Sequence, residues 1–146
     1  MFNSIAGRYD FLNHFLSFNT DVRWRKKVVK TIKRLSAASQ IPLNETHLLD
    51  VATGTGDMAF ELHKFNPASI TGLDISEEML KIARKKAEAR GFNSISFISG
   101  DSESLEFPDN KFDFIQFQLL SQCPIFTLSN CRIVELSHCQ IIKLLN

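Results

Sequence analysis

Hydrophobic and polar positions follow a helical period through the first part of this chain. Apolar residues recur at four-three-four spacing within residues 2–35, and a second apolar stripe runs beside the first. Gly7 and the polar break at 17–20 interrupt the pattern, so we predict two or three helices, the last over 23–35. The first stripe comprises Ile5, Tyr9, Leu12 and Leu16, and the second comprises Phe11, Phe15, Phe18 and Val22.

From residue 47 onward, short apolar runs alternate with helical patterns. Ser76 is expected to begin a helix as its N-cap, and Gly91 to end that helix. Strands separated by single helices pair in parallel through right-handed crossovers, so the pattern predicts an α/β fold. Residues 132–145 fit either an amphipathic helix or two short strands. The predicted strands are 47–52, 69–74, 94–99 and one beginning at Phe112, and the predicted helices are 57–65 and 77–90.

The first of these strands leads into a Gly-Thr-Gly turn, which is a candidate nucleotide site. Gly54 and Gly56 allow a tight turn and a close approach of the backbone to a ligand, where a Cβ would collide. Together with Ala59, and with Asp74 placed eighteen residues after Gly56, they satisfy the dinucleotide fingerprint. That pattern alone has low specificity.

Acidic residues around the turn favour one class of nucleotide. Asp50 and Asp57 would place two carboxylates beside a doubly charged pyrophosphate, which removes much of what the helix terminus offers. S-adenosylmethionine presents a sulfonium and an ammonium instead. The charge pattern therefore favours S-adenosylmethionine as the cofactor over NAD, with a simple helix-capping role as the alternative for Asp57.

Two further acids follow the second and third strands. Asp74 is suited to accept hydrogen bonds from both ribose hydroxyls, and Asp101 to receive the adenine amino group. The carboxyl ends of parallel strands meet at one edge of the sheet, where open α/β folds bind ligands. The alternatives are a turn residue for Asp74 and an ordinary loop acid for Asp101.

Composition narrows the class of protein. With 146 residues, of which 44 % are hydrophobic, the chain suffices for one compact core. No run approaches the roughly 18 apolar residues of a membrane span, and the first ten residues lack a secretory h-region, so we expect a cytoplasmic protein. Three cysteines with eight-residue gaps match no common zinc spacing and are interpreted as unpaired thiols. We expect no metal and no nucleic-acid partner.

Charge is unevenly distributed along the chain. Residues 1–36 carry eight Lys and Arg against two Asp, whereas the remainder carries nine against fourteen acids. One interpretation is a helical lid over the glycine turn, with an aromatic wall for a hydrophobic substrate and a basic rim facing a membrane surface. The other is that the aromatic residues pack on the sheet and the basic residues form a solvated face.

Several segments together are more specific than the turn. They lie within about residues 1–115, and the N-terminal one is the most specific. These segments are Met1–Asp10 with Leu12–His14, Asp21–Arg25, Leu49–Asp57, Asp74–Ser76 with Met79 and Leu80, and Phe107–Asn110 with Phe112 and Asp113. In them the chain resembles the ubiquinone/menaquinone biosynthesis C-methyltransferases, most closely the demethylmenaquinone methyltransferases.

The resemblance implies a fold, a reaction and a site. The fold would be an incomplete Rossmann-like class I methyltransferase of about four parallel strands, with a lid over 1–36, a cofactor-binding half over 47–118 and an atypical tail over 119–146. The implied reaction is methylation of a ring carbon of demethylmenaquinol, an isoprenoid quinol. No catalytic base is identified, although His14 is a candidate, and the oligomeric state is left open. The implied cofactor-binding residues are Tyr9, Asp50, Gly54, Thr55, Gly56, Asp74, Ile75, Asp101 and Ser102.

The resemblance ends where the tail begins. The family continues the fourth strand into Phe-Gly-x-Arg-Asn, whereas residues 117–122 here read Phe-Gln-Leu-Leu-Ser-Gln. We interpret the change as a shifted reading frame or a disrupted gene. The fourth strand would then be an exposed edge unless the tail covers it, and exposed apolar area would cause weak stability and association. Two alternative functions stay open: an NAD-type oxidoreductase fragment and a non-catalytic remnant or interaction module.

Overall fold

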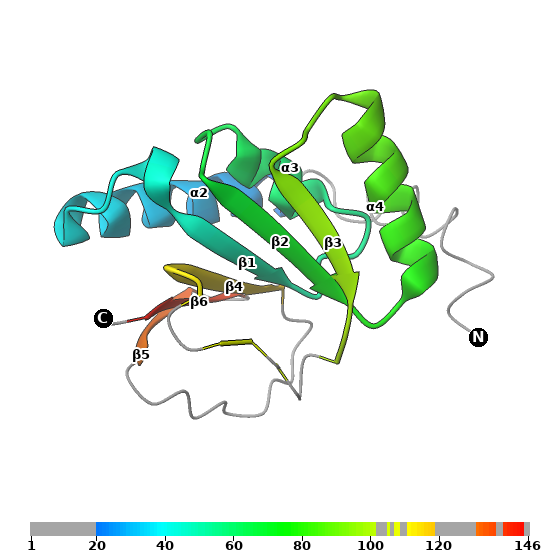
Figure 1. Ribbon diagram of the computed structural model, residues 1–146. Coiled ribbons are helices and arrows are strands. Elements are labelled where there is room, and N and C mark those ends of the chain that lie inside the picture. Colours follow the sequence, from blue (N-terminus) through cyan, green and yellow to red (C-terminus); the bar gives the residue numbers. More distant parts are fainter. Residues whose placement is uncertain are drawn as a thin grey trace.

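Six strands form one sheet in the order β3-β2-β1-β4-β6-β5 (Figure 1). The computed structural model describes residues 20–101, 105, 107–108, 111–118, 131–136 and 139–144. The four strands from β3 to β4 are mutually parallel, which confirms the predicted α/β class. The strands are β1 (His47–Val51), β2 (Ser69–Asp74), β3 (Ile95–Ser99), β4 (Phe114–Gln118), β5 (Cys131–Leu136) and β6 (Cys139–Leu144).

The helices confirm the predicted pattern, with shifted ends. The helix predicted over 23–35 extends further in both directions, from Thr20 to Ser39. The helix predicted to reach residue 65 ends two residues earlier, before a turn in which Asn66 has a φ of 53°. The stripes of residues 1–19 lie outside the described residues. The helical elements are α2 (Thr20–Ser39), the short 3-10 helix η1 (Leu43–Glu45), α3 (Asp57–His63) and α4 (Glu77–Ala89).

The ends of α4 follow the sequence signals. The Ser76 hydroxyl accepts a hydrogen bond from the Met79 N–H at 3.5 Å, as expected of an N-cap. Gly91, just beyond the helix, has a φ of 67°, a left-handed conformation that glycine adopts without steric cost. These two residues fix the length of the crossover between β2 and β3.

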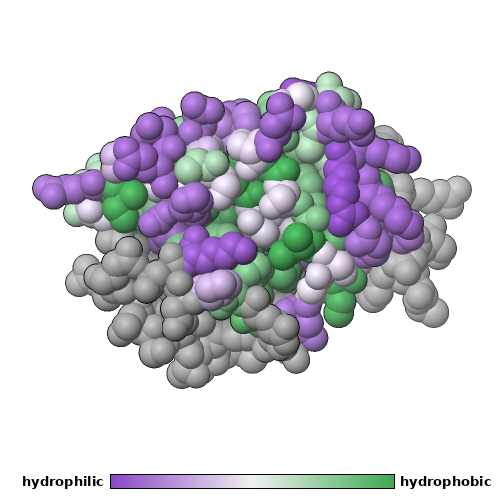
Figure 2. Space-filling view, in the orientation of Figure 1, coloured by the Kyte–Doolittle hydropathy of each residue, from purple (hydrophilic) through white to green (hydrophobic). Residues whose placement is uncertain are grey.

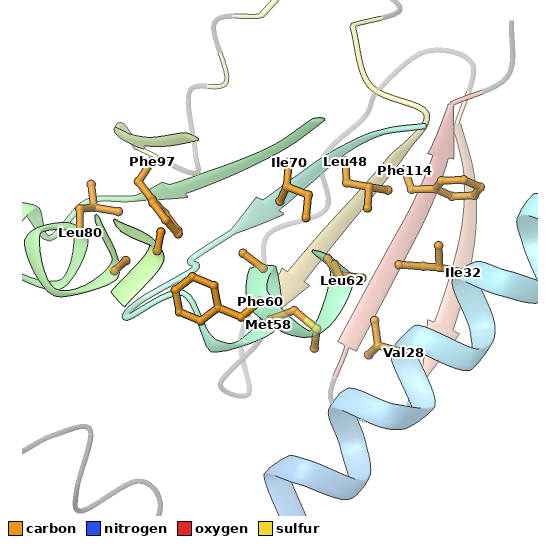
Figure 3. Close-up of a cluster of buried hydrophobic side chains, with 13 residues drawn as sticks. Val28, Ile32, Leu48, Met58, Phe60, Leu62, Ile70, Leu80, Phe97 and Phe114 are labelled. Carbon is orange, nitrogen blue, oxygen red and sulfur yellow. The ribbon is translucent and has the colours of Figure 1, made fainter. Parts of the chain in front are cut away.

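The main core lies between the sheet and the three helices (Figure 3). Val28 and Ile32 extend from α2 toward the strands, where Leu48 and Phe114 lie on neighbouring β1 and β4. Met58 and its neighbours in α3 fill the space between them. The described half of the predicted lid segment is therefore packed into the sheet domain through α2.

A smaller cluster covers the opposite face of the sheet. It contains Leu49, Val51, Leu73, Phe112 and Ile115, each at most 5 % exposed. Adjacent residues of β1 thus enter different clusters because successive side chains of a strand point to opposite faces. Among the residues whose side-chain exposure is described, which end at Gln116, Ile75 is the one large hydrophobic side chain that is exposed. For the side chains beyond Gln116 the expected exposed apolar area stays a prediction.

The tail forms two strands, the second of its predicted alternatives. β6 pairs antiparallel with β4 from Phe114↔Lys143 to Gln118↔Cys139, and β5 pairs antiparallel with β6. The fourth strand is therefore an interior strand, and the edge on that side of the sheet is β5. This ladder saturates backbone groups of β4 that would otherwise be open to another chain.

Candidate functional site

The turn between β1 and α3 has an unusual backbone. Ala52, Gly54 and Gly56 have φ values of 58°, 57° and 85°, so alternate residues are left-handed. The Thr53 N–H donates to the Leu73 carbonyl at 3.0 Å, and the Gly56 N–H donates to the Thr53 carbonyl at 3.0 Å. The first bond attaches the turn to β2 and the second closes it upon itself, immediately beyond the carboxyl ends of the parallel strands.

The two glycines serve different purposes. A Cβ on Gly56 would lie 2.9 Å from Cζ of Phe97 and 3.0 Å from Cζ of Phe60, so glycine permits close packing beneath the turn. A Cβ on Gly54 would meet nothing within 4 Å. Gly54 therefore leaves its backbone accessible on that side, as a ligand lying against the turn would require.

Asp74 joins the turn to the end of β2. Its Oδ2 accepts the Gly54 N–H at 2.8 Å, and its Oδ1 accepts the Ser76 N–H at 2.9 Å. The structure thus brings together two residues predicted for the site. The second bond also gives Asp74 the turn role considered as its alternative, and a carboxylate has lone pairs left on both oxygens for further hydroxyl donors.

Asp50 lies inside the protein below the turn. Its side chain is fully buried, Oδ2 accepts the Thr53 hydroxyl at 2.6 Å, and Oδ1 has no hydrogen-bond partner. Burial raises the pKa of Asp50 from 3.8 to about 7; the Thr53 bond opposes this change, the charge of Asp74 adds to it, and the Ala59 N–H opposes it. A nearby cation would favour the ionised form of this carboxyl group.

Asp57 is neutralised in a way that sequence reasoning missed. Its Oδ2 lies 3.4 Å from an Arg25 guanidinium nitrogen on α2, and its Oδ1 lies 3.3 Å from Lys86 Nζ on α4. Lys86 also donates to the Thr55 hydroxyl at 2.9 Å. The predicted repulsion between Asp57 and a pyrophosphate was therefore overstated, because two cations accompany this carboxylate.

Of the other residues predicted for the site, Ile75 and Asp101 are described and are exposed at the surface. Ile75, directly after Asp74, is 73 % exposed. The Gly100 N–H donates to the Asp74 carbonyl at 3.0 Å, so the loop that carries the exposed Asp101 begins beside the end of β2. Tyr9 and Ser102 lie outside the described residues.

Three participating residues were not predicted. Arg25 and Lys86 come from other helices, and no local spacing links either of them to the turn. Thr53 carried a signal, because a hydroxyl three residues after a strand-end acid can return to its carboxylate.

The site as a whole consists of acceptors around an accessible backbone. Asp74 presents a carboxylate and the Gly54 backbone is open, whereas Asp50 lies fully buried beneath them with one oxygen unpartnered. Acceptors of this kind suit a ligand with hydroxyl donors and positive charge, such as S-adenosylmethionine. Because Asp57 is already paired with two cations, the negative charge that could attract a positively charged ligand comes from Asp74 and from Asp50 when it is ionised.

Known proteins with similar sequences agree on one chemistry. Demethylmenaquinone methyltransferase of Thermus thermophilus is 46 % identical over 114 residues, covering 77 % of this chain and 48 % of the relative. The ubiquinone/menaquinone biosynthesis C-methyltransferase UbiE of Geotalea uraniireducens is 41 % identical over 116 residues, covering 77 % and 46 %. This chain spans about half the length of these relatives.

Solved structures agree on the fold. A candidate S-adenosyl-L-methionine-dependent methyltransferase of Methanococcus maripaludis superposes with a TM-score of 0.62 at 23 % identity, covering 77 % of this chain and 48 % of that one. The YcgJ protein of Bacillus subtilis gives a TM-score of 0.54 at 28 % identity, covering 62 % and 35 %.

A family model matches most of the chain. The match covers residues 1–120, and it includes the turn, Asp74 and the start of the loop with Asp101. It ends within two residues of the end of β4, where the predicted resemblance also stops. The comparisons give no support to the NAD-type alternative. The chain belongs to the ubiE/COQ5 methyltransferase family.

Proposed function

We propose that this chain binds S-adenosylmethionine at the β1–α3 turn and contributes that site to methylation of a ring carbon of demethylmenaquinol. The observation that carries the proposal is the contact of Asp74 Oδ2 with the Gly54 N–H at 2.8 Å. It places a carboxylate against an open glycine backbone at the ligand-binding edge of a parallel sheet. Family membership supports the choice of a methyl donor.

Each described residue has a defined part in this proposal. Asp74 holds the ribose hydroxyls through lone pairs that its two backbone donors leave available. Gly54 provides room for the donor against the turn, and Ile75 offers its exposed apolar side chain to the adenine ring. Asp50 faces the positive charge of the donor from below, as an ionised carboxylate.

The reaction itself asks little covalent chemistry of the protein. The bound donor supplies an electrophilic methyl group on its sulfonium. The chain contributes alignment of the acceptor carbon with that methyl group and exclusion of water. Tyr9 and Ser102 complete the proposed site, and His14 is the candidate base for the quinol hydroxyl.

The substrate class follows from the relatives. The Thermus thermophilus relative is a demethylmenaquinone methyltransferase, and the acceptor proposed here is the corresponding isoprenoid quinol. A substrate with an isoprenoid tail resides in a lipid bilayer, so contact with a membrane surface is part of the proposal. None of the described helices combines the length and the apolar character needed to cross a membrane.

The test separates donor binding from catalysis. Calorimetric titration with S-adenosylhomocysteine is expected to show binding, and Asp74→Asn is expected to weaken it about tenfold or more, the usual effect of losing a charge-assisted hydrogen bond. Asp113→Asn is the matched control. Asp113 also accepts a backbone N–H, from His47 at 2.7 Å, but at the amino end of β1, away from the glycine turn.

Equal affinity of the two variants would reject the assignment of Asp74. Absence of binding by the unsubstituted chain, with binding of a nicotinamide dinucleotide, would instead favour the oxidoreductase alternative. A methyl-transfer assay with demethylmenaquinol then distinguishes an active chain from a non-catalytic remnant that binds the donor alone.

A further inference from the structure

Six cations form one continuous stripe on α2. Their positions follow each other at intervals of three, one, three, three and one, which keeps them on a single side of a helix. All six are exposed, and the stripe extends for about 16 Å at the rise of an α-helix. The basic stripe consists of Arg23, Lys26, Lys27, Lys30, Lys33 and Arg34.

No described carboxylate neutralises the basic stripe. The described lysines that do form ion pairs lie outside α2. These pairs join Lys64 to Glu61, Lys81 to Glu78 and Lys86 to Asp57. Within the described part of the chain, the stripe makes one cation–π contact, in which Lys33 Nζ lies over the Phe65 ring, 5.3 Å from its centroid. The edge of the molecule along α2 is correspondingly hydrophilic (Figure 2).

The opposite side of α2 is fixed to the domain. Val28 and Ile32 are fully buried in the main core, and Thr31 and Ser36 are also buried. The stripe is therefore a surface of a rigid, packed helix, with its orientation set by the core. Arg25, which lies between Arg23 and Lys26 in the sequence, pairs with Asp57 and so connects the same helix to the proposed donor site.

We propose that the basic stripe docks this protein on an anionic lipid bilayer. A one-sided row of cations on a helix complements a negatively charged membrane surface. This inference rests on the proposed function, because an isoprenoid quinol is drawn from a bilayer. It adds the surface of the protein that meets the lipid. Single-stranded nucleic acid is the competing polyanion. The aromatic ring described beside the stripe is that of Phe65, which is half-buried and has Lys33 Nζ over its face, so this face is not open to a stacking base.

The experiment measures binding to vesicles in a flotation assay. Vesicles of phosphatidylcholine alone are compared with an equal mixture of phosphatidylcholine and phosphatidylglycerol. The unsubstituted chain is expected to float with the mixed vesicles and to be released by added salt, which screens the attraction. The triple variant Lys26→Gln, Lys27→Gln and Lys30→Gln is expected to lose roughly a hundredfold in partition, at about fivefold for each basic residue beside the surface.

The control variant changes net charge equally at other exposed lysines. It combines Lys64→Gln, Lys81→Gln and Lys85→Gln, which lie outside α2, and it is expected to bind vesicles as the unsubstituted chain does. Equal losses in the two variants, or no binding of the unsubstituted chain to mixed vesicles, would overturn the proposal. So would a mobility shift with single-stranded RNA without vesicle binding.

A second readout keeps this inference separate from the proposed function. Titration of both triple variants with S-adenosylhomocysteine is expected to give unchanged affinity, which also shows that they fold. Donor binding without vesicle binding would contradict the docking surface alone. Vesicle binding without donor binding would contradict the proposed function and leave the docking surface supported.

Discussion

At the scale of single residues, Asp50 makes stability depend on pH. Its pKa is raised from 3.8 to about 7 by burial, so the folded protein holds a proton that the unfolded chain releases above about pH 4. Stability contributed by this group is present at low pH and falls as pH rises between these values. The loss is on the order of 4 kcal/mol over that range.

We therefore expect Asp50→Asn to gain stability relative to the unsubstituted chain as pH rises from about 4 to about 7. Asn keeps a carbonyl oxygen for the Thr53 hydroxyl but does not ionise. Urea unfolding of both proteins at several pH values measures the difference. A difference that does not change with pH would mean that the buried carboxyl group titrates normally.

Contacts between single residues could be predicted from the sequence where both residues follow the carboxyl ends of parallel strands. Asp74 and Gly54 were expected at one edge because both follow parallel strands, and their hydrogen bond confirms that they meet. The pairing of Asp57 with Arg25 and Lys86 could not be predicted, because it depends on how α2 and α4 pack around α3. The roles of the site residues toward a ligand stay predictions.

At the scale of elements, the β1–α3 turn depends on two glycines that should respond differently to substitution. Both have positive φ, so alanine costs roughly 1 kcal/mol at either position through the backbone alone. At Gly56 the added Cβ also meets Phe97 and Phe60 at 3.0 Å or less, and overpacking adds about 1–3 kcal/mol.

Gly56→Ala is therefore expected to lower the free energy of unfolding clearly more than Gly54→Ala does. Chemical denaturation of the two variants measures this directly. Equal losses would indicate that the aromatic rings move aside at little cost, and that the turn requires glycine for its backbone conformation alone.

The elements themselves were largely predictable because their periods differ. The segment predicted as the second strand coincides with Ser69–Asp74, which lies between the Asn66-Pro67 turn and the helix that Ser76 begins. The end of α2 was missed because Ser36 and Ser39 are weaker helix formers than the two alanines between them. The helix nevertheless continues to Ser39, whose hydroxyl donates to the Leu35 carbonyl at 2.7 Å. The tail stayed ambiguous because a short apolar segment fits either period.

At the scale of the whole molecule, the sheet is completed by the segment that departs from the family. β6 occupies the place next to β4, and its five paired residues close an edge that the parallel strands leave open. This arrangement could not be predicted from the sequence, because strand order across the sheet depends on contacts between segments far apart in the chain. It also explains how a chain spanning about half the length of its relatives keeps β4 in the interior of the sheet.

The ladder between β4 and β6 should therefore hold the molecule together. Ile141, which pairs with Gln116 at the centre of the ladder, is the position to change. Proline there fixes φ and removes a backbone N–H, so Ile141→Pro is expected to cost about 3 kcal/mol or more and to promote association through the freed edge of β4. Ile141→Val keeps the N–H and the β-branched shape, and it is expected to behave nearly as the unsubstituted chain does. Light scattering during size-exclusion chromatography, together with urea unfolding, compares the two variants. If both stayed equally stable and equally dispersed, β6 would be a dispensable addition, and the parallel strands would be sufficient as a folding unit.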